Sequence, residues 1–363
     1  MGDLFPVLFS PENAKNLKII TKEKEPVSHI GILVNKVSFY GHTFKLASIG
    51  SVCTAPEHRG KGLATRLLLY TEEYLRESGI PVMLISGTRG LYKRHGCDEF
   101  GIIYYFDLSS VKIEKLHSIE VKEYDPSELN FILKLYQQEP VRFFRKRCHI
   151  KKILDIICTS QDSFWSKFIV IKQNNETTAY VVLLGRREKN LIKSVKVFEY
   201  AGDRDHLISS IPLIKERFLK SGWKFVWPVP HQDEEMVRKM CYKKIPVKIR
   251  PLNEHTIKVI DFSKLMDSLL EYIFERIEVE FSYEKSSTEF LIRCRKEGKG
   301  KVAELRFENF GALHFFLFGK GNESRQNKNI KYHGEQSLLY ELSKAFPLPT
   351  ICLLYTSPSP RDL

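Results

Sequence analysis

Paired cysteines and metal-binding motifs are missing from this sequence. Its seven cysteines are odd in number and none forms a C-x-x-C pair, and its eleven histidines form no H-E-x-x-H or H-x₃₋₅-H group. This usage indicates reduced thiols and argues against a disulfide framework or a zinc site. We therefore predict no bound metal.

Long apolar runs are missing as well. No run approaches the roughly 18 residues that a helix needs to span a bilayer, and the start from Met1 to Pro6 lacks the regions of a secretory signal. We expect a cytoplasmic protein with no membrane span. The chain has 363 residues, of which 43% are hydrophobic and 12% aromatic, which predicts a globular protein of two or three domains.

Acidic residues are in the minority. The chain has 44 Asp and Glu against 57 Lys and Arg, and its formal charge of +13 suits polyanionic partners. The densest basic stretch, residues 142–152, interleaves cations with aromatic side chains and could grip a nucleic acid strand. The other interpretation is a helix with packed apolar residues and solvated cations. We favour this helix and do not expect nucleic acid as a partner.

The most informative stretch is a strand that runs through a glycine-spaced turn into a helix. Residues 46–54 are apolar and tolerate β structure, and residues 63–75 repeat apolar side chains at helical spacing. A helix start with glycines at positions 60 and 62 exposes backbone N–H groups, so phosphate is the expected guest. The spacing matches neither a Walker loop nor a Rossmann turn.

The turn carries a different pattern, R-x-x-G-x-A, introduced by V-x-T-x-P. It resembles the pyrophosphate loop of the GCN5-related N-acetyltransferase (GNAT) superfamily, whose members bind acetyl-CoA. The alternative is an ordinary glycine-containing turn with a basic tip. The resemblance implies acetyl-CoA as co-substrate, with a splayed strand pairing with its pantetheine arm. The implied cofactor-binding residues are Val52, Cys53, Thr54, Arg59, Gly60, Lys61, Gly62, Leu63, Ala64 and Thr65.

A second run, Gly90 to Cys97, follows the apolar strand at 81–86. It is similar to a second GNAT motif, whose tyrosine lies on the helix beyond the next strand. Tyr92 falls on that tyrosine, and the resemblance implies that Tyr92 is the catalytic general acid that protonates the leaving thiolate. Leu91 and Cys97 depart from the family by standing at packing positions where aromatics are usual. The alternative for Tyr92 is a core residue with a satisfied hydroxyl.

The general base is left open by the sequence. His29, His42 and Glu57 are candidates, and a water relay would need none of them. Cys53 could be a nucleophile, but it lacks a visible pattern of His with Asn or Asp partners. We interpret Cys53 as a strand residue.

The order of elements predicts a mixed α/β (α+β) fold in three parts. We expect a catalytic GNAT domain at 1–115, a degenerate GNAT-like domain at 116–257 and a sterol-carrier-like α+β domain at 258–351. This order is similar to that of the enhanced-intracellular-survival type acetyltransferases.

The later parts carry further expectations. In the second, Asp203 and Asp205 stand at a helix start and would repel pyrophosphate, so we expect no second cofactor site there. In the third, we expect a helix to about Arg276 and then strands at 277–283, 289–294, 302–308 and 312–318.

Both ends of the chain look unusual. Residues 352–363 read like a translated sequencing adapter, and we expect a non-native tail there, with a disordered Ser-Pro tail as the alternative. The segment before the first strands is short for the superfamily, so we expect an incomplete N-terminus. In the enzymes that the chain resembles, the terminal carboxylate acts as a base, and that group cannot be assigned here.

Together these features predict an acetyl-CoA-dependent N-acetyltransferase that acts by direct transfer on a primary amine of a small molecule or peptide. The alternative function is a non-catalytic protein on the same fold that senses acetyl-CoA or binds nucleic acid. The oligomeric state is left open, with a homo-oligomer as one option.

Overall fold

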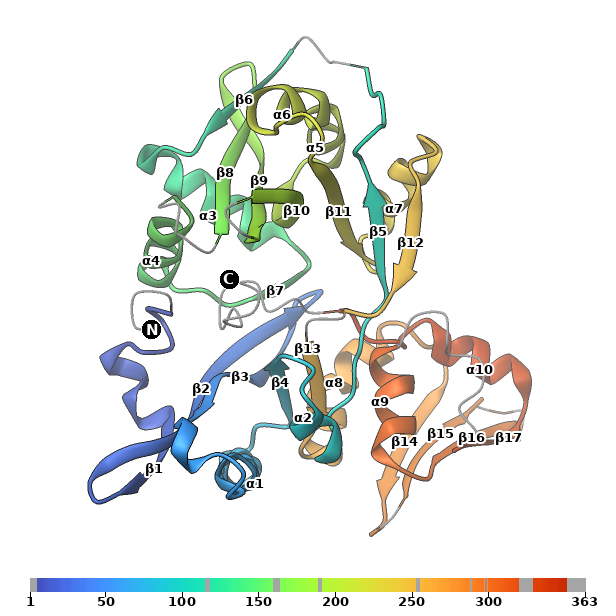
Figure 1. Ribbon diagram of the computed structural model, residues 1–363. Coiled ribbons are helices and arrows are strands. Elements are labelled where there is room, and N and C mark those ends of the chain that lie inside the picture. The colour runs from blue at the N-terminus through green and yellow to red at the C-terminus, as the bar shows by residue number, and fades with distance from the viewer. Residues whose placement is uncertain are drawn as a thin grey trace. The chain divides into compact units, whose positions relative to one another are not determined.

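The computed structural model describes residues 5–114, 118–158, 164–188, 191–252, 255–287, 289–296, 298, 300–319 and 329–350. The predicted tail at 352–363 lies outside these residues. Within them the chain divides into two compact units, shown with their elements in Figure 1. The first unit contains residues 8–102 and the described residues from 250 onward, and the second contains residues 5–7 and 103–249.

The main sheet of the first unit has the strand order β1-β2-β3-β4-β13. Strands β1, β2 and β3 are antiparallel neighbours, β4 runs parallel to β3, and β13 is antiparallel to β4. The strands are β1 (Leu17–Lys22), β2 (Glu25–Phe39), β3 (His42–Thr54), β4 (Val82–Ser86) and β13 (His255–Val259). The helices beside them are the short 3₁₀ turns η1 (Pro11–Asn16) and η2 (Pro56–His58), then α1 (Leu63–Glu77) and α2 (Gly90–Arg94).

Helix α1 forms where the apolar spacing predicts it. Leu67, Leu68 and Leu75 are buried against Ile49 of β3 and Ile85 of β4, which gives the sheet its core on this face. The helix ends just before Gly79, which adopts a left-handed φ of 67°. This packing holds the start of α1 beside the end of β3.

A second sheet of the first unit has the order β14-β15-β16-β17, with all neighbours antiparallel. Its strands are β14 (Glu280–Lys285), β15 (Phe290–Arg295), β16 (Val302–Phe307) and β17 (Ile330–Gly334), and the helices of this region are α8 (Phe262–Phe274), α9 (Phe310–Phe318) and α10 (Gln336–Ser343).

The strand predicted at 312–318 is wrong, because this segment is helix α9. Asn309 caps the helix by accepting a hydrogen bond from the Ala312 N–H at 2.9 Å. The helix is apolar apart from His314, and Leu313 and Leu317 are fully buried. A short apolar run of this kind has no periodicity that separates a buried helix from a buried strand.

The sheet of the second unit has the order β12-β5-β11-β10-β9-β8-β6. Its strands are β5 (Ile103–Asp107), β6 (Ile119–Glu123), β8 (Phe164–Gln173), β9 (Glu176–Glu188), β10 (Leu191–Gly202), β11 (Lys224–Pro230) and β12 (Val247–Arg250). The short strand β7 (Val141–Phe143) is not part of this sheet. The helices of this unit are η3 (Pro126–Glu128), α3 (Leu129–Gln138), α4 (Arg147–Cys158), α5 (Arg204–Ser209), α6 (Ile211–Phe218) and α7 (Glu234–Tyr242).

The two units repeat one arrangement of elements. In each, an antiparallel strand pair (β2 with β3, β9 with β10) is followed by helix and then by a strand parallel to the second (β4, β11). The helical segment that begins after Asp203 is split into α5 and α6, because Pro212 has no backbone N–H to donate within a continuous helix.

The sheet of each unit is completed by a strand that is distant in the sequence. Strand β5, which follows the Tyr92 helix in the chain, pairs antiparallel with β11, from Asp107 against Val226 to Ile103 against Pro230. Strand β13, from the far side of the second repeat in the sequence, pairs with β4. The sheet that carries the glycine turn is therefore completed by residues more than 150 positions away from it.

Candidate active site

Strand β3 loses one neighbour before it ends. It pairs with β2 as far as Thr54, but its parallel ladder with β4 stops at the pair Ile49 and Ile85. From Gly50 to Thr54 the edge of β3 on that side is therefore outside the β4 ladder. An unpaired strand edge offers N–H and C=O groups to an extended ligand.

A β-bulge between β2 and β3 lies directly after the point where β3 and β4 part. The register between β2 and β3 shifts between His29 and Gly31, so that β3 has one more residue than β2 over this interval. Ser51 lies in the bulge with a φ of 52°, a left-handed value that is uncommon outside glycine. The bulge sets the direction of the backbone from Val52 to Thr54.

The glycine turn has the backbone that an anion site needs. Gly60 and Gly62 have φ values of 76° and 72°, and Gly62 is the residue that precedes helix α1. A Cβ built on either glycine would have no heavy atom of the described residues within 4 Å, so conformation rather than crowding favours glycine here.

The start of α1 is open to an anion. Gly62 has no side chain to cap the helix, and the first turn of α1 contains no acidic residue. The N–H groups of Leu63, Ala64 and Thr65 belong to the first turn, where no intrahelical acceptor exists. Together with the helix dipole they form a site that suits a phosphate.

Cations surround the turn. Lys61 and Arg59 are exposed, and Arg59 donates from Nε to the Thr54 carbonyl at 3.3 Å. Arg89, which the sequence analysis did not single out, lies with Nη1 3.5 Å from the Val52 carbonyl. Its place directly before the Gly90 run was the only signal in the sequence that could have indicated it.

Tyr92 lies on α2 with 2% of its surface exposed. Its ring belongs to the core shared with Leu67 of α1 and Ile85 of β4. The ring edge is 3.6 Å from the position that a Cβ on Gly87 would take, directly after the end of β4. Tyr92 is therefore close to the place where β3 and β4 part, and its role as general acid stays a prediction.

The thiol of Cys53 stays protonated near neutral pH. Burial raises the pKa of Cys53 above the usual value of 9.0, and the positive charge of Arg89 lowers it by a smaller amount. A protonated thiol is a poor nucleophile. This supports the interpretation of Cys53 as a strand residue.

The base candidates lie in different places. His42 begins β3, and its Nε2 is 2.8 Å from the carboxylate of Glu275, the residue directly after α8. About 40 Å of strand, at roughly 3.3 Å per residue, separates His42 from Thr54. Glu57 is an exposed residue of η2. His29 is opposite Cys53 on β2. Of the two histidines, only His29 is beside the parted strands.

The second unit parts its strands in the same way. The ladder between β10 and β11 ends at the pair Lys196 and Val226, although β10 continues to Gly202. Here carboxylates take the positions around the strand end. Asp203 caps α5 by accepting from the His206 N–H at 2.8 Å, which agrees with the acidic helix start expected from the sequence.

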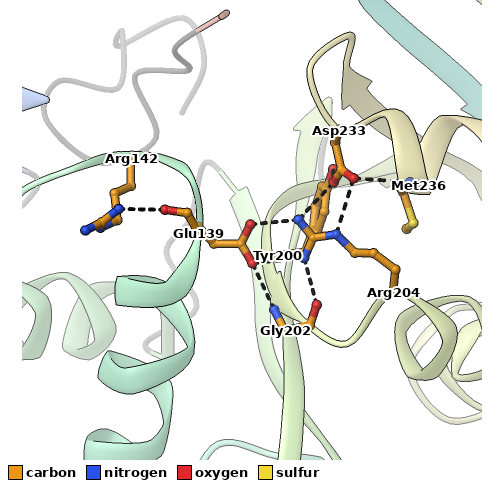
Figure 2. A network of polar contacts seen from close by, with 7 residues as sticks. All are labelled: Glu139, Arg142, Tyr200, Gly202, Arg204, Asp233 and Met236. Atoms are coloured by element: carbon orange, nitrogen blue, oxygen red, sulfur yellow. Dashed lines mark hydrogen bonds and ion pairs between the residues drawn. The ribbon is translucent and has the colours of Figure 1, made fainter. Parts of the chain in front are cut away.

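Figure 2 shows the network next to this strand end. Glu139 accepts hydrogen bonds from the Gly202 N–H at 3.0 Å and from both terminal nitrogens of Arg204 at 2.9 and 2.7 Å. Asp233 lies on the other side of the Arg204 guanidinium, at 3.0 Å, and accepts from the Tyr200 hydroxyl at 2.8 Å. The carboxylates would repel a phosphate here.

The sequence and fold were compared with known proteins. Residues 10–100 match the family model of the acetyltransferase (GNAT) domain. No curated protein matches the sequence at a significant level. A GCN5-related N-acetyltransferase from Anabaena variabilis has a similar structure, with a TM-score of 0.61, 17% identity, and coverage of 91% of this chain and 86% of that one.

Two more solved structures have similar folds. One is a protein of unknown function from Enterococcus faecalis described as a probable N-acyltransferase, with a TM-score of 0.61, 12% identity and coverage of 91% and 86%. The other is Eis1 from Mycobacterium abscessus, with a TM-score of 0.56, 11% identity and coverage of 95% of this chain and 90% of that one. At these identities the likeness concerns the fold.

Residues 10–100, which contain the glycine turn and the parted strands, match a GNAT acetyltransferase domain. The protein is therefore an acyltransferase, and its multidomain fold resembles that of Eis1.

The described residues contain neither a membrane-spanning helix nor a metal-binding cluster. None of the helices in this part of the chain is long and apolar enough to cross a membrane. The same residues contain no group of three or more His, Cys, Asp or Glu side chains arranged to hold a metal ion.

Proposed function

We propose that this protein is an acetyl-CoA-dependent N-acetyltransferase that transfers the acetyl group directly to a primary amine of a small molecule or peptide. One observation carries the proposal: an uncapped helix start with two left-handed glycines lies beside a strand edge that has lost its partner. The first feature suits a diphosphate and the second suits an extended amide-containing arm.

Different residues bind the diphosphate and the pantetheine arm of acetyl-CoA. Backbone N–H groups of residues 63–65 hold the diphosphate, with Gly60 and Gly62 keeping the approach clear and Arg59 and Lys61 adding positive charge. Backbone groups of residues 52–54 pair with the pantetheine arm and orient the thioester carbonyl. Most of the rate enhancement then comes from holding the thioester beside the amine.

The chemical step needs one proton donor. When the neutral amine attacks the thioester carbon, the C–S bond breaks and the electron pair leaves with sulfur. Tyr92 donates its phenolic proton to that sulfur. A phenol with a pKa of about 10 is an adequate donor to a thiolate only when it is hydrogen-bonded at the sulfur. The burial of Tyr92 beside the end of β4 supports this placement.

The basic stretch gives less support to a nucleic-acid function. Arg145 forms an ion pair with Glu199 at 2.8 Å, with 10% and 7% of the two side chains exposed. Arg142 donates to the Glu139 carbonyl at 2.7 Å. Two of the cations that could have gripped a phosphate backbone are thus used within the second unit, which favours a structural role for this stretch.

The wider assignments belong to the same proposal. They are a division near residues 115 and 257, a structural role for the second repeat, a sterol-carrier-like third part and a cytoplasmic location. The antiparallel sheet β14–β17 with helices α8 to α10 supports the third of these.

The proposal is tested by placing a negative charge at the helix start. In Gly62→Asp a carboxylate occupies the anion position, and Asp tolerates the left-handed backbone better than most residues. We expect acetyl-CoA affinity measured by calorimetry to fall at least about a hundredfold, equivalent to about 2.8 kcal/mol, and thiol release with an amine panel to disappear.

The matched control is Gly41→Asp. Gly41 also has a positive φ, 100°, and open space around its Cβ position, but it lies in the turn at the other end of β3. The Gly41 variant should bind acetyl-CoA as the unchanged protein does. Equal affinity in both variants would contradict the assignment of the turn.

A further inference from the structure

His29 makes a hydrogen bond to the backbone at the β-bulge. Its Nδ1 is 2.8 Å from the carbonyl oxygen of Ser51. Because a carbonyl oxygen only accepts, Nδ1 carries the proton and donates it. The bond runs from β2 to the residue of β3 that has the left-handed backbone.

This bond has a clear structural task. A left-handed residue inside a strand costs about 1–3 kcal/mol unless its surroundings hold it. Only 4% of the surface of Ser51 is exposed, so its carbonyl also needs a hydrogen-bond partner within the protein. The His29 donor meets both needs, because it satisfies the carbonyl only while the bulge keeps its shape.

An aromatic ring packs against one face of the His29 imidazole. The ring of Phe9 stacks on it with centroids 5.6 Å apart and planes at 24°. The other ring nitrogen, Nε2, is buried and has no hydrogen-bond partner among the described residues. The hydrogen bond from Nδ1 therefore fixes the orientation of the ring, and the Ser51 carbonyl is its hydrogen-bond partner among the described residues.

The second repeat offers a comparison. Its corresponding strand pair also shifts register, between Val197 and Glu199. Tyr180 of the neighbouring strand β9 reaches this bulge and donates its hydroxyl proton to the Glu199 carboxylate at 2.8 Å. Both bulges are thus contacted by a ring from the neighbouring antiparallel strand, but His29 bonds to a backbone carbonyl of its bulge, whereas Tyr180 bonds to a side chain.

We propose that His29 is a positioning residue that fixes the Ser51 bulge and so aims the backbone groups of residues 52–54 at the pantetheine arm. This inference rests on the proposed function for its ligand. It gives His29 a role through the backbone of β3 and not through contact with the reacting atoms. A base role would instead need Nε2.

Three substitutions of His29 distinguish the role of Nδ1 from that of Nε2. The amide nitrogen of His29→Asn can take the place of Nδ1, that of His29→Gln the place of Nε2, and His29→Phe keeps only the stacking. We expect the acetyl-CoA dissociation constant, measured by calorimetry, to rise about tenfold in the Gln and Phe variants, as for one lost hydrogen bond to a buried carbonyl. The Asn variant should stay within about twofold of the original value.

The matched control is Phe9→Leu, which removes the stacked ring but leaves the Nδ1 bond. Its acetyl-CoA affinity should be nearly unchanged, and urea unfolding should show every variant to be folded under assay conditions. If affinity is unchanged in all three His29 variants, or if Asn loses as much as Phe, the positioning role is wrong. Lost turnover with intact affinity in all three would point to Nε2 as a base and also overturn it.

A second measurement tests the stability of the Ser51 bulge in the absence of acetyl-CoA. Amide hydrogen exchange of residues 50–54 should be faster in His29→Phe than in the unchanged protein and close to normal in His29→Asn. Equal exchange in the Phe variant and the unchanged protein would overturn the positioning role. Failure of the unchanged protein to bind acetyl-CoA would instead overturn the proposed function, while the exchange result still decides the role of His29.

Discussion

At the scale of single residues, Tyr92 has the most specific assignment. Phe in its place keeps the ring that packs with Leu67 and Ile85 and removes only the hydroxyl. We expect Tyr92→Phe to lower turnover about a hundredfold, the contribution typical of general acid catalysis, and to leave acetyl-CoA affinity unchanged. Thiol release and calorimetry measure the two quantities.

The control for this substitution is Tyr74→Phe. It removes another tyrosine hydroxyl of the same unit, one that donates to Asn16 Oδ1 at 2.9 Å. Its turnover should remain normal. Normal turnover in Tyr92→Phe as well would make Tyr92 a core residue and nothing more.

Cys53 gives a prediction about pH. Burial raises the pKa of its thiol and the charge of Arg89 opposes that rise. A raised pKa means less thiolate at a given pH, so alkylation of Cys53 should need a higher pH than alkylation of a thiol with the usual pKa. In Arg89→Gln the opposing charge is gone, and the midpoint of the alkylation profile should move to still higher pH.

Peptide-resolved mass spectrometry after iodoacetamide treatment separates Cys53 from Cys148 and Cys241, and all three residues are exposed. The profile of Cys148 should be the same with and without Arg89. A midpoint for Cys53 that stays or moves down in the Arg89 variant would contradict the electrostatic role of Arg89.

At the scale of elements, the sequence predicts what depends on local chemistry. The strand, glycine turn and helix around residues 46–79 follow their apolar spacing and stop signals closely. The turn at Asn174 and Asn175 has the same local origin, because asparagine tolerates the positive φ values of 50° and 66° found there. These features are set by residues within a few positions of one another.

Other elements could not be predicted for equally physical reasons. The bulge at Ser51 has no local signal, because a serine gives no preference for a positive φ and the bond from His29 comes from 22 positions away. The apolar run of α9 fits a strand as well as a helix until its surroundings are known. The Asn309 cap was the one sequence feature that favoured the helix.

At the scale of the whole molecule, the sequence predicts the repeated order of strands and helices but not the sheet that each strand joins. The pattern of β5 shows a strand, and only long-range pairing places it beside β11. The buried ion pair between Lys258 of β13 and Glu72 of α1, at 2.7 Å, is another such contact. Periodicity carries no information about partners this distant.

The shared architecture also explains why the two repeats differ chemically. Both end a long strand beside a parted neighbour, but one continues into bare glycines and the other into the Glu139 and Arg204 network. The candidate active site is therefore assigned to the first repeat by the absence of acidic side chains from the first turn of α1 among the described residues. The proposed cofactor site depends on that difference.

A crystal structure determined at saturating acetyl-CoA tests this central claim most directly. The account predicts the diphosphate on the N–H groups of residues 63–65 and the pantetheine arm along residues 52–54 of β3. Acetyl-CoA bound elsewhere, or absent from the turn after Gly60 while bound at the second repeat, would contradict it.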